Sequence, residues 1–433
     1  MSFDQLAALV VLAAVVGALI WGRLRSDVVA LAGAAALLGL GVVRPVEVQG
    51  AFASPAVIAL ASLFVISYAM ELTGLLGLII RGAVRLCGRF GEAGLWAVIA
   101  LSGAASAFLN NTPIVVLGAP VVRDVAESLK LSPRRFLIPL SYVTILGGSC
   151  TLIGTSTNLL VNDMARTAGQ PAFGIFEITM VGVIVAAAGG LYLYLVGARL
   201  LERQAGAEPV RNPVADDGEA EGALAEPSFF AADRPVRPVG AILSLVVFVG
   251  VVTAATLGFA PIAASAFAGA VLLVLLRVIS AEEAYKGLRP EILLLIAGMV
   301  VVGLSLELTG LAASATGALA TWVQALGPLA ALAILYLVTS ILTEILSNAA
   351  VAVLLTPVAV ALAESLGVNP RPFLVAIMLA ASASFATPFG YQTNVLVFQM
   401  GGYRYMDFVR IGLPLNVLTA AVAIAVIPAF FPF

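Results

Sequence analysis

The sequence predicts an all-α integral membrane protein of two inverted repeats, each with about five spanning helices, a re-entrant hairpin and one broken helix. Three observations support this fold class. First, the 433 residues are 61% hydrophobic and only 11% charged, whereas soluble domains carry about 25% charged residues. Second, apolar stretches of about 17 to 25 residues, long enough to cross a bilayer, recur along the whole chain. Third, the two halves of the chain resemble each other in sequence.

Composition also excludes several classes of function. The mean hydropathy of +1.10 leaves too little polar surface to cover a water-soluble core, so the lipid bilayer is the expected surrounding. A net charge of −2 without a basic cluster argues against nucleic acid as a partner. The chain has two cysteines, Cys87 and Cys150, and no histidine, so neither a disulfide framework nor a thiolate–imidazole metal site is expected. No enzyme chemistry is visible.

The internal repeat consists of three segments that recur in the same order at an offset of 236 or 237 positions. The matched segments are MELTGLL (70–76) with LELTGLA (306–312), 110–137 with 347–374, and GTSTNLLV (154–161) with GYQTNVLV (390–397). We therefore divide the chain into a first repeat at 1–202, a polar linker at 203–238 and a second repeat at 239–433. The linker is rich in Pro, Ala and acidic residues, which is typical of a flexible connection.

Each repeat is predicted to contain the same elements. Spans are expected near 5–22, 27–43, 55–80, 134–161 and 176–198, and again near 239–257, 261–279, 290–312, 371–400 and 411–431. Between the third and fourth spans lie two apolar arms that meet at polar residues, in 93–130 and in 328–366. Polar, helix-breaking residues at a matched midpoint favour a re-entrant hairpin. The alternative is a pair of ordinary spans joined by a loop.

Charge asymmetry sets the predicted orientation. Five spans per repeat invert the second repeat and place all Lys and Arg residues except Arg44, Arg166 and Arg371 on the side of the linker. The positive-inside rule makes that side cytoplasmic. Both termini are then expected in the periplasm, and the protein in the inner (plasma) membrane of a bacterium. If each hairpin counted as a single span, this separation of charge would be lost.

A second break in each repeat lies in the fourth span, at GGSCTLIGTSTN (147–158) and SFATPFGYQTN (384–394). Gly, Ser, Thr and Pro free backbone carbonyls for a cation, and the restarted helix offers N–H groups and its positive dipole end to an anion. Inverted repeats with broken helices are the architecture of secondary transporters, whose site lies at the repeat interface. Unwound backbone at membrane depth is tolerated where it lines a cavity.

The hairpin tips carry oxygen ligands at helical spacing. Ser106 precedes Asn110 by four residues, as Thr343 precedes Ser347, so each pair lies on one face of an arm. Such hard oxygen ligands suit an alkali cation, although a single intramembrane Ser or Thr usually bonds to its own helix. Two asparagine pairs also match between the repeats, Asn111 with Asn348 and Asn158 with Asn394. An amide can contact an anion and a cation together.

These tips, breaks and the repeat resemble the divalent anion:sodium symporter family, within the superfamily of citrate, arsenite and sodium/proton carriers. The resemblance implies one Na⁺ site at Ser106, Asn110, Asn111 and Gly154, and a second at Thr343, Ser347, Asn348, Ala386 and Pro388. It implies anion binding by Asn111, Thr112 and Asn348, to which we add the neighbouring candidates Ser347, Thr157, Asn158, Thr393 and Asn394. It also implies a homodimer that works by an elevator motion, with 27–80 and 261–312 as the static scaffold.

Two departures from the family pattern bear on the substrate. Family members carry Ser-Asn-Thr at both tips, whereas this chain has Asn110-Asn111-Thr112 and Ser347-Asn348-Ala349. The missing hydroxyl at Ala349 argues against a dicarboxylate, and the combination of motifs is most similar to the sulfate-permease branch. Neither tip has Arg or Lys beside it in the sequence, which suggests that cations neutralise the anion.

The predicted function is therefore Na⁺-coupled secondary transport of a small divalent anion, most simply sulfate. Glu344, beside Thr343, is a candidate for adding negative charge to the second cation site or for carrying a proton. The alternatives are a dicarboxylate symporter or exchanger, and an arsenite or Na⁺/H⁺ antiporter. A channel is a third class, for which no hydrated ring of charges is visible.

Overall fold

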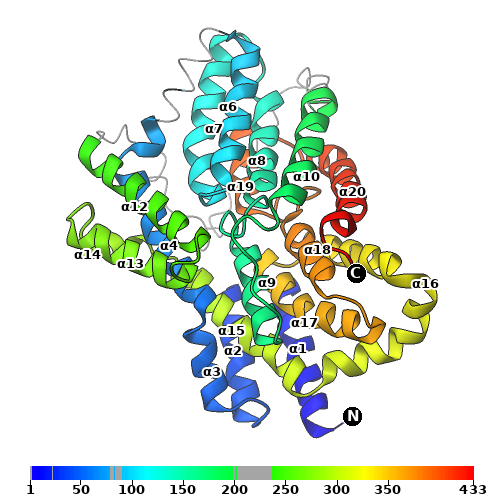
Figure 1. Cartoon of the computed structure of the whole chain (residues 1–433). Helices are drawn as coiled ribbons and strands as arrows, with labels where there is room; N and C mark the ends of the chain where they lie inside the picture. Colours follow the sequence, from blue (N-terminus) through cyan, green and yellow to red (C-terminus); the bar gives the residue numbers. More distant parts are fainter. Residues whose placement is uncertain (1, 22, 79–81, 83–89, 198–199, 202–236) are drawn as a thin grey trace.

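Figure 1 shows the computed structural model of the chain, which describes residues 2–21, 23–78, 82, 90–197, 200–201 and 237–433. The regular structure of these residues is helical, which confirms the predicted all-α class. The predicted linker, 203–238, lies outside the described residues except at its C-terminal end.

The helices of the first half follow the apolar stretches. They are α1 (Phe3–Trp21), α2 (Ser26–Gly39), α3 (Pro45–Phe52), α4 (Pro55–Leu72), α6 (Glu92–Ser106), α7 (Asn111–Ser128), α8 (Arg134–Gly148), α9 (Ser156–Thr167) and α10 (Thr179–Tyr192), which continues as the π-helical turn η1 (Leu193–Gly197). The predicted break at 147–158 separates α8 from α9.

The second half repeats this order. Its helices are α12 (Pro238–Thr256), α13 (Ile262–Leu275), α14 (Ala281–Gly287), α15 (Pro290–Leu308), α16 (Leu311–Leu342), α17 (Asn348–Leu366), α18 (Arg371–Ser382), α19 (Gln392–Gly401) and α20 (Tyr405–Phe430). Gly327 interrupts α16 with φ 80° and ψ 166°, a conformation that glycine adopts without steric cost. The arm of the predicted second hairpin begins at the following Pro328. The break at 384–394 separates α18 from α19.

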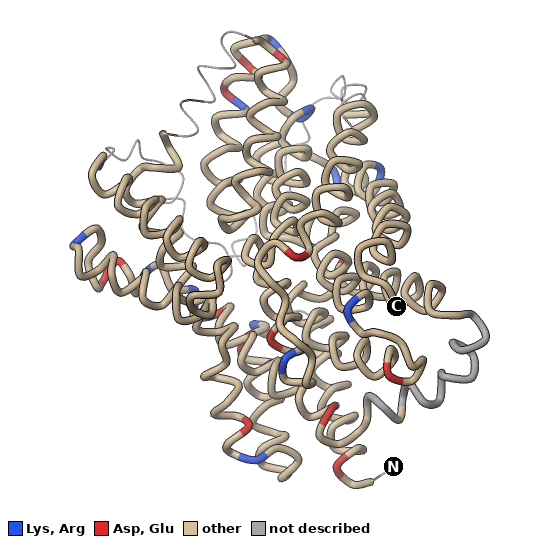
Figure 2. The backbone as a smooth tube through the Cα atoms, viewed as in Figure 1, with Lys and Arg blue, Asp and Glu red and all other residues tan. Residues whose placement is uncertain are grey.

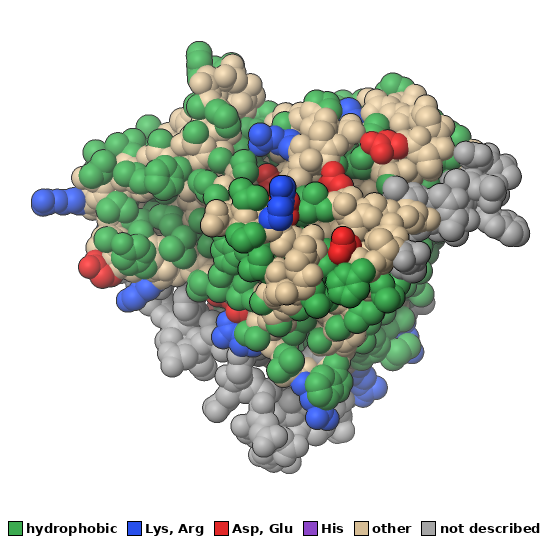
Figure 3. Space-filling view, turned by 90° about the horizontal axis from the view of Figure 1, so that it is seen from below, with side chains coloured by type: hydrophobic (Ala, Val, Ile, Leu, Met, Phe, Trp, Pro, Cys, Tyr) green, Lys and Arg blue, Asp and Glu red, His purple; other side chains and the backbone are tan. Residues whose placement is uncertain are grey.

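The outer surface is that of a membrane protein. Seven helices of the described part are long and apolar enough to cross a bilayer, among them α1, α12, α15 and α20. Large side chains on this surface are apolar and exposed, such as Val239 at 70%, Leu275 at 73% and Phe259 at 80%. Charged residues are sparse and lie mostly near helix ends (Figure 2), and hydrophobic side chains cover much of the face seen in Figure 3. Apolar surface of this extent requires lipid around it, and the chain is a multi-pass membrane protein.

Packing between the halves brings the breaks and the tips together. The restarted helix of each half contacts the second arm of the other half's hairpin: α9 packs on α17, and α19 packs on α7. These four helices form a first group. A second group consists of α2 packed on α15 and α4 packed on α13, on the left and lower side of Figure 1. This second group has its own contacts with the first through α4 on α9 and α15 on α17. A cavity forms between the two groups.

Candidate substrate and cation site

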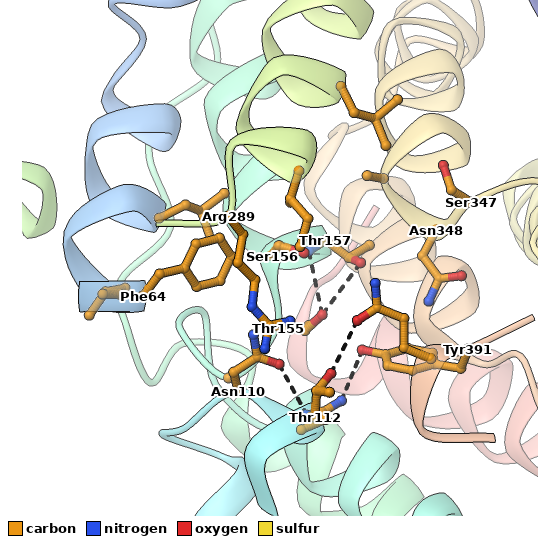
Figure 4. A pocket seen from close by; sticks show the side chains of 18 of the residues that line it. Phe64, Asn110, Thr112, Thr155, Ser156, Thr157, Arg289, Ser347, Asn348 and Tyr391 are labelled. Atoms are coloured by element: carbon orange, nitrogen blue, oxygen red, sulfur yellow. Dashed lines mark hydrogen bonds between the residues drawn. The ribbon is translucent and has the colours of Figure 1, made fainter. Parts of the chain in front are cut away.

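The cavity has a volume of about 400 Å³ and is lined by both hairpin tips and both helix breaks. Asn110, Asn111 and Thr112 come from the first tip, and Ser347, Asn348 and Ala349 from the second. Residues 153–157 and 389–392 of the two breaks complete this part of the lining. Helices α4 and α15 contribute the opposite wall, which includes Phe64 and Arg289 (Figure 4).

Four helices begin at this cavity, and the first residue of each lines it. These residues are Asn111 of α7, Ser156 of α9, Asn348 of α17 and Gln392 of α19. The first N–H groups of a helix have no partner within the helix, and the helix dipole gives this end a partial positive charge. A cavity bordered by several helix N-termini therefore favours an anion without needing many formal charges.

The first tip is held by side-chain hydrogen bonds. Asn110 caps α7 by accepting from the backbone N–H of Thr112 at 3.2 Å. The Ser106 hydroxyl donates to Oδ1 of Asn111, and Nδ2 of Asn111 donates to the Tyr391 hydroxyl at 2.9 Å. The Asn111 amide is thus fixed from both ends, by its own hairpin and by the break of the other half. This fixed amide lies at the cavity wall.

The second tip repeats part of this arrangement. Ser347 caps α17 by accepting from the Ala350 N–H at 3.3 Å, as Asn110 caps α7. The Thr343 hydroxyl lies 2.9 Å from Oδ1 of Asn348 and 2.7 Å from the Ala381 carbonyl oxygen, and donates its single proton to one of these two acceptors. The contact with Asn348 corresponds to the one between Ser106 and Asn111 at the repeat offset of 237 positions. The predicted spacing therefore places a hydroxyl beside the tip asparagine in both halves.

The asparagines of the two breaks lie behind the residues that line the cavity. Asn158 and Asn394 are fully buried. Nδ2 of Asn158 donates to the Thr151 carbonyl at 2.9 Å, and Nδ2 of Asn394 donates to the Ser384 carbonyl at 2.9 Å. These amides hold the unwound segments in place. Neither lines the cavity, and nor does Thr393, whose hydroxyl accepts from Ser141.

The other predicted residues divide between the cavity wall and the layer behind it. Of the candidates, the cavity lining includes Asn110, Asn111, Thr112, Gly154, Thr157, Glu344, Ser347 and Asn348. Ser106, Thr343, Ala386 and Pro388 are not part of it. Ser106 and Thr343 lie behind the cavity wall, where their hydroxyls contact the tip asparagines Asn111 and Asn348.

Arg289 corrects the expectation that no basic residue lies near the tips. It precedes α15, lines the cavity, and carries its guanidinium carbon 5.8 Å from the centre of the Phe64 ring. Figure 4 shows its side chain extending toward the side of the cavity formed by Asn110 and Thr155. No local pattern could reveal this, because Arg289 is distant in sequence from both tips and its counterpart in the first repeat is not basic. Arg289 and Glu344 are the charged residues among the described lining.

Tyr391 and Gln392 were also missed by sequence reasoning. Gln392 accepts from the Thr112 hydroxyl at 3.3 Å, and Tyr391 accepts from Asn111. The repeat offset did offer a signal, since Tyr391 occupies the position of Thr155 in the first half. A larger, hydroxyl-bearing side chain at one of two matched positions indicates that the two halves of the site differ.

A helical membrane fold whose two halves bring hairpin tips and broken helices to one cavity defines a secondary transporter. The chain belongs to the citrate transporter family, whose model matches residues 16–367 and 346–433. This confirms the predicted relationship to the ion-transporter superfamily.

Individual relatives are also transporters. The chain is 27% identical to an uncharacterized transporter of Synechocystis, over 95% of this chain and 94% of that protein. It is 36% identical to sodium/sulfate cotransporter 1 of Chlamydomonas reinhardtii over 36% of this chain and 18% of that protein. The crystal structure of the YdaH transporter of Alcanivorax borkumensis shares the fold with a TM-score of 0.63 at 15% identity, covering 88% of this chain and 86% of that one.

Proposed function

We propose that this transporter carries a small divalent anion, sulfate, together with Na⁺. The observation that carries the proposal is the set of helix N-termini at one cavity, those of α7, α9, α17 and α19, facing Arg289 across it. These groups offer hydrogen-bond donors and positive potential from several directions, which suits an anion with acceptor oxygens on all sides. The partial match to a sodium/sulfate cotransporter supports the same substrate.

Sodium coupling is supported by backbone oxygens of the first repeat. A Cβ atom built on Gly154 would lie 2.4 Å from the Gly148 carbonyl oxygen, 2.7 Å from that of Ala107 and 2.9 Å from that of Ser106. Three carbonyl oxygens therefore converge beside Gly154, a position that tolerates no side chain. Oδ1 of Asn111 is close by, 2.7 Å from a Cβ built on Gly148. Neutral oxygens of this kind are the ligands that hard cations prefer, and these residues include the predicted first Na⁺ site.

Uptake of radiolabelled sulfate into proteoliposomes, with and without an inward Na⁺ gradient, tests this function. Sulfate uptake should require Na⁺, and unlabelled sulfate should compete better than succinate or citrate. Sodium-independent exchange of anions would favour an exchanger, and preference for succinate would favour a dicarboxylate carrier. Non-saturable flux would indicate a channel.

Orientation and assembly complete the proposal. We place the protein in a bacterial inner membrane with both termini in the periplasm and the 203–238 linker in the cytoplasm, from the distribution of basic residues. Single cysteines introduced at Leu131 and in the linker, after replacement of Cys87 and Cys150, should both be labelled from the cytoplasmic side. Labelling from opposite sides would contradict the hairpins. We also propose a homodimer with a moving hairpin group, which a monomeric mass in lipid with intact transport would contradict.

A further inference from the structure

At two matched positions of the two repeats, the backbone carbonyl oxygens differ in whether they accept a hydrogen bond from the protein. In the first repeat, the carbonyl oxygens of Ser106 and Gly148, the last residues of α6 and α8, accept no backbone hydrogen bond from outside these helices in the described part of the chain. The carbonyl of Ala107 accepts from the Thr151 hydroxyl. Buried carbonyls are almost always paired. These two carbonyl oxygens and that of Ala107 lie within 2.9 Å of one point beside Gly154, where carbonyl oxygens can contribute ligands to a cation.

The second repeat can be compared residue by residue, because the repeat offset relates the positions. Ser106, Ala107 and Gly148 correspond to Thr343, Glu344 and Ser384, and Gly154 corresponds to Gly390. A side chain thus replaces hydrogen at the position of Gly148. The Ser384 hydroxyl oxygen lies 1.8 Å from where a Cβ on Gly390 would be, so it occupies the space beside this glycine. At the corresponding place in the first repeat, beside Gly154, lie the three carbonyl oxygens.

Two of the three corresponding carbonyls of the second repeat accept a hydrogen bond. The Thr343 carbonyl accepts from the Ser384 hydroxyl at 3.2 Å. The Glu344 carbonyl lies 3.4 Å from the Thr387 hydroxyl, whose single proton goes to the Glu344 carboxylate at 2.9 Å. The Ser384 carbonyl accepts from Nδ2 of Asn394 at 2.9 Å. The Ser384 hydroxyl and the Asn394 amide thus donate to oxygens that a cation would otherwise bind.

The Glu344 side chain closes the same region. Its Oε1 accepts from the Ala386 N–H at 2.8 Å and from Nδ2 of Asn416 at 2.7 Å. Its Oε2 accepts from the Thr387 hydroxyl at 2.9 Å and lies 3.3 Å from the Ser384 hydroxyl. A carboxylate has about four lone-pair directions; three donors take three of them and tie α20 to the break. Its counterpart Ala107 can make no such bonds.

We infer that the two repeat-related groups of oxygens differ in kind: the first binds Na⁺, whereas Ser384 and Glu344 occupy the second and hold the break between α18 and α19. This inference rests on the proposed Na⁺ coupling and deepens it. Instead of the two Na⁺ sites expected from the family resemblance, it assigns one Na⁺ site to the first repeat and a set of structural hydrogen bonds to the second. It says nothing against further cations bound elsewhere in the molecule.

Sodium-dependent thermal stability of the full chain in detergent tests the inference, because it reads binding without transport. Ser106→Ala and Thr343→Ala are compared because each removes the hydroxyl beside a tip asparagine; Thr343→Ala also removes a contact with the Ala381 carbonyl. We expect Ser106→Ala to raise the Na⁺ concentration for half-maximal stabilisation about tenfold, the effect of losing a ligand-orienting bond. Thr343→Ala should leave that concentration unchanged. Choline at equal ionic strength is the control.

A double variant makes the opposite test. Ser384→Gly with Glu344→Ala gives the second repeat the residues of the first, and should add a second ²²Na⁺ bound per chain. Equal weakening by Ser106→Ala and Thr343→Ala, or no gain of ²²Na⁺ in a folded double variant, would overturn the inference and leave sodium coupling intact. Absence of any Na⁺ response in the wild-type protein would overturn sodium coupling as well.

Discussion

Replacement of Arg289 by glutamine is the sharpest test of how the cavity attracts its anion. Arg289 directly precedes α15 on the cavity wall formed by α4 and α15, and its guanidinium carbon lies 5.8 Å from the centre of the Phe64 ring. Glutamine keeps an amide donor and most of the side-chain volume but removes the positive charge. The loss is therefore mainly electrostatic, and packing against Phe64 changes little.

Two limits bound the size of the effect. If the guanidinium contacts the anion directly, loss of a hydrogen bond between charged groups costs about 1.5–3 kcal/mol, which is about ten- to a hundredfold in affinity. The cavity of about 400 Å³ also leaves room for water between them. Across a water molecule, unit charges about 7 Å apart interact by about 0.6 kcal/mol, and a divalent anion doubles this to about 1.2 kcal/mol. The smaller limit therefore predicts a loss of about sevenfold.

The assay is sulfate uptake in proteoliposomes over a range of sulfate concentrations, with Lys286→Gln as the matched control. Lys286 is exposed, lies just before Arg289 in sequence and is not part of the cavity lining. Arg289→Gln should raise the half-saturating sulfate concentration, Arg289→Lys should raise it less, and the control should behave as wild type. A change of less than about twofold in Arg289→Gln, or an equal change in the control, would refute the role given to this charge.

Two further predictions concern the lining. Ala349 lines the cavity at the position that corresponds to Thr112 of the first tip. Ala349→Thr should improve competition by succinate about tenfold, whereas Thr112→Ala should weaken sulfate binding. Unchanged competition in both variants would contradict this explanation of specificity. Tyr391→Phe deletes the hydroxyl that accepts from Asn111 at 2.9 Å and should weaken sulfate binding by about fivefold, the value of one neutral hydrogen bond. Tyr285→Phe at an exposed position controls for the substitution, and equal behaviour of the two variants would count against the fixed amide.

The residues of the tips could be predicted because the capping residues and the hydroxyl spacing that identify them lie within a few positions of one another in the sequence. Asn111 and Asn348 follow polar caps at the start of a helix, and the spacing from Ser106 and Thr343 places a hydroxyl where it can reach the amide. The roles of Asn158 and Asn394 could not be predicted in the same way. An amide beside an unwound segment can bind a ligand or pair the freed carbonyls, and the sequence is the same in both cases. The structure has these amides on the carbonyls.

The sequence by itself determined the membrane class, the helical fold, the repeated motifs and the candidate residues at both tips and breaks, because hydropathy, spacing and self-similarity are local properties of the chain. Only the tertiary structure decided that Arg289 lines the cavity and that the Ser384 hydroxyl lies beside Gly390, where the first repeat has carbonyl oxygens beside Gly154. These outcomes depend on contacts between helices far apart in the chain, such as α9 with α17 and α19 with α7. Local patterns show which face of a helix is polar, but the partner of that face is fixed only when the two halves pack.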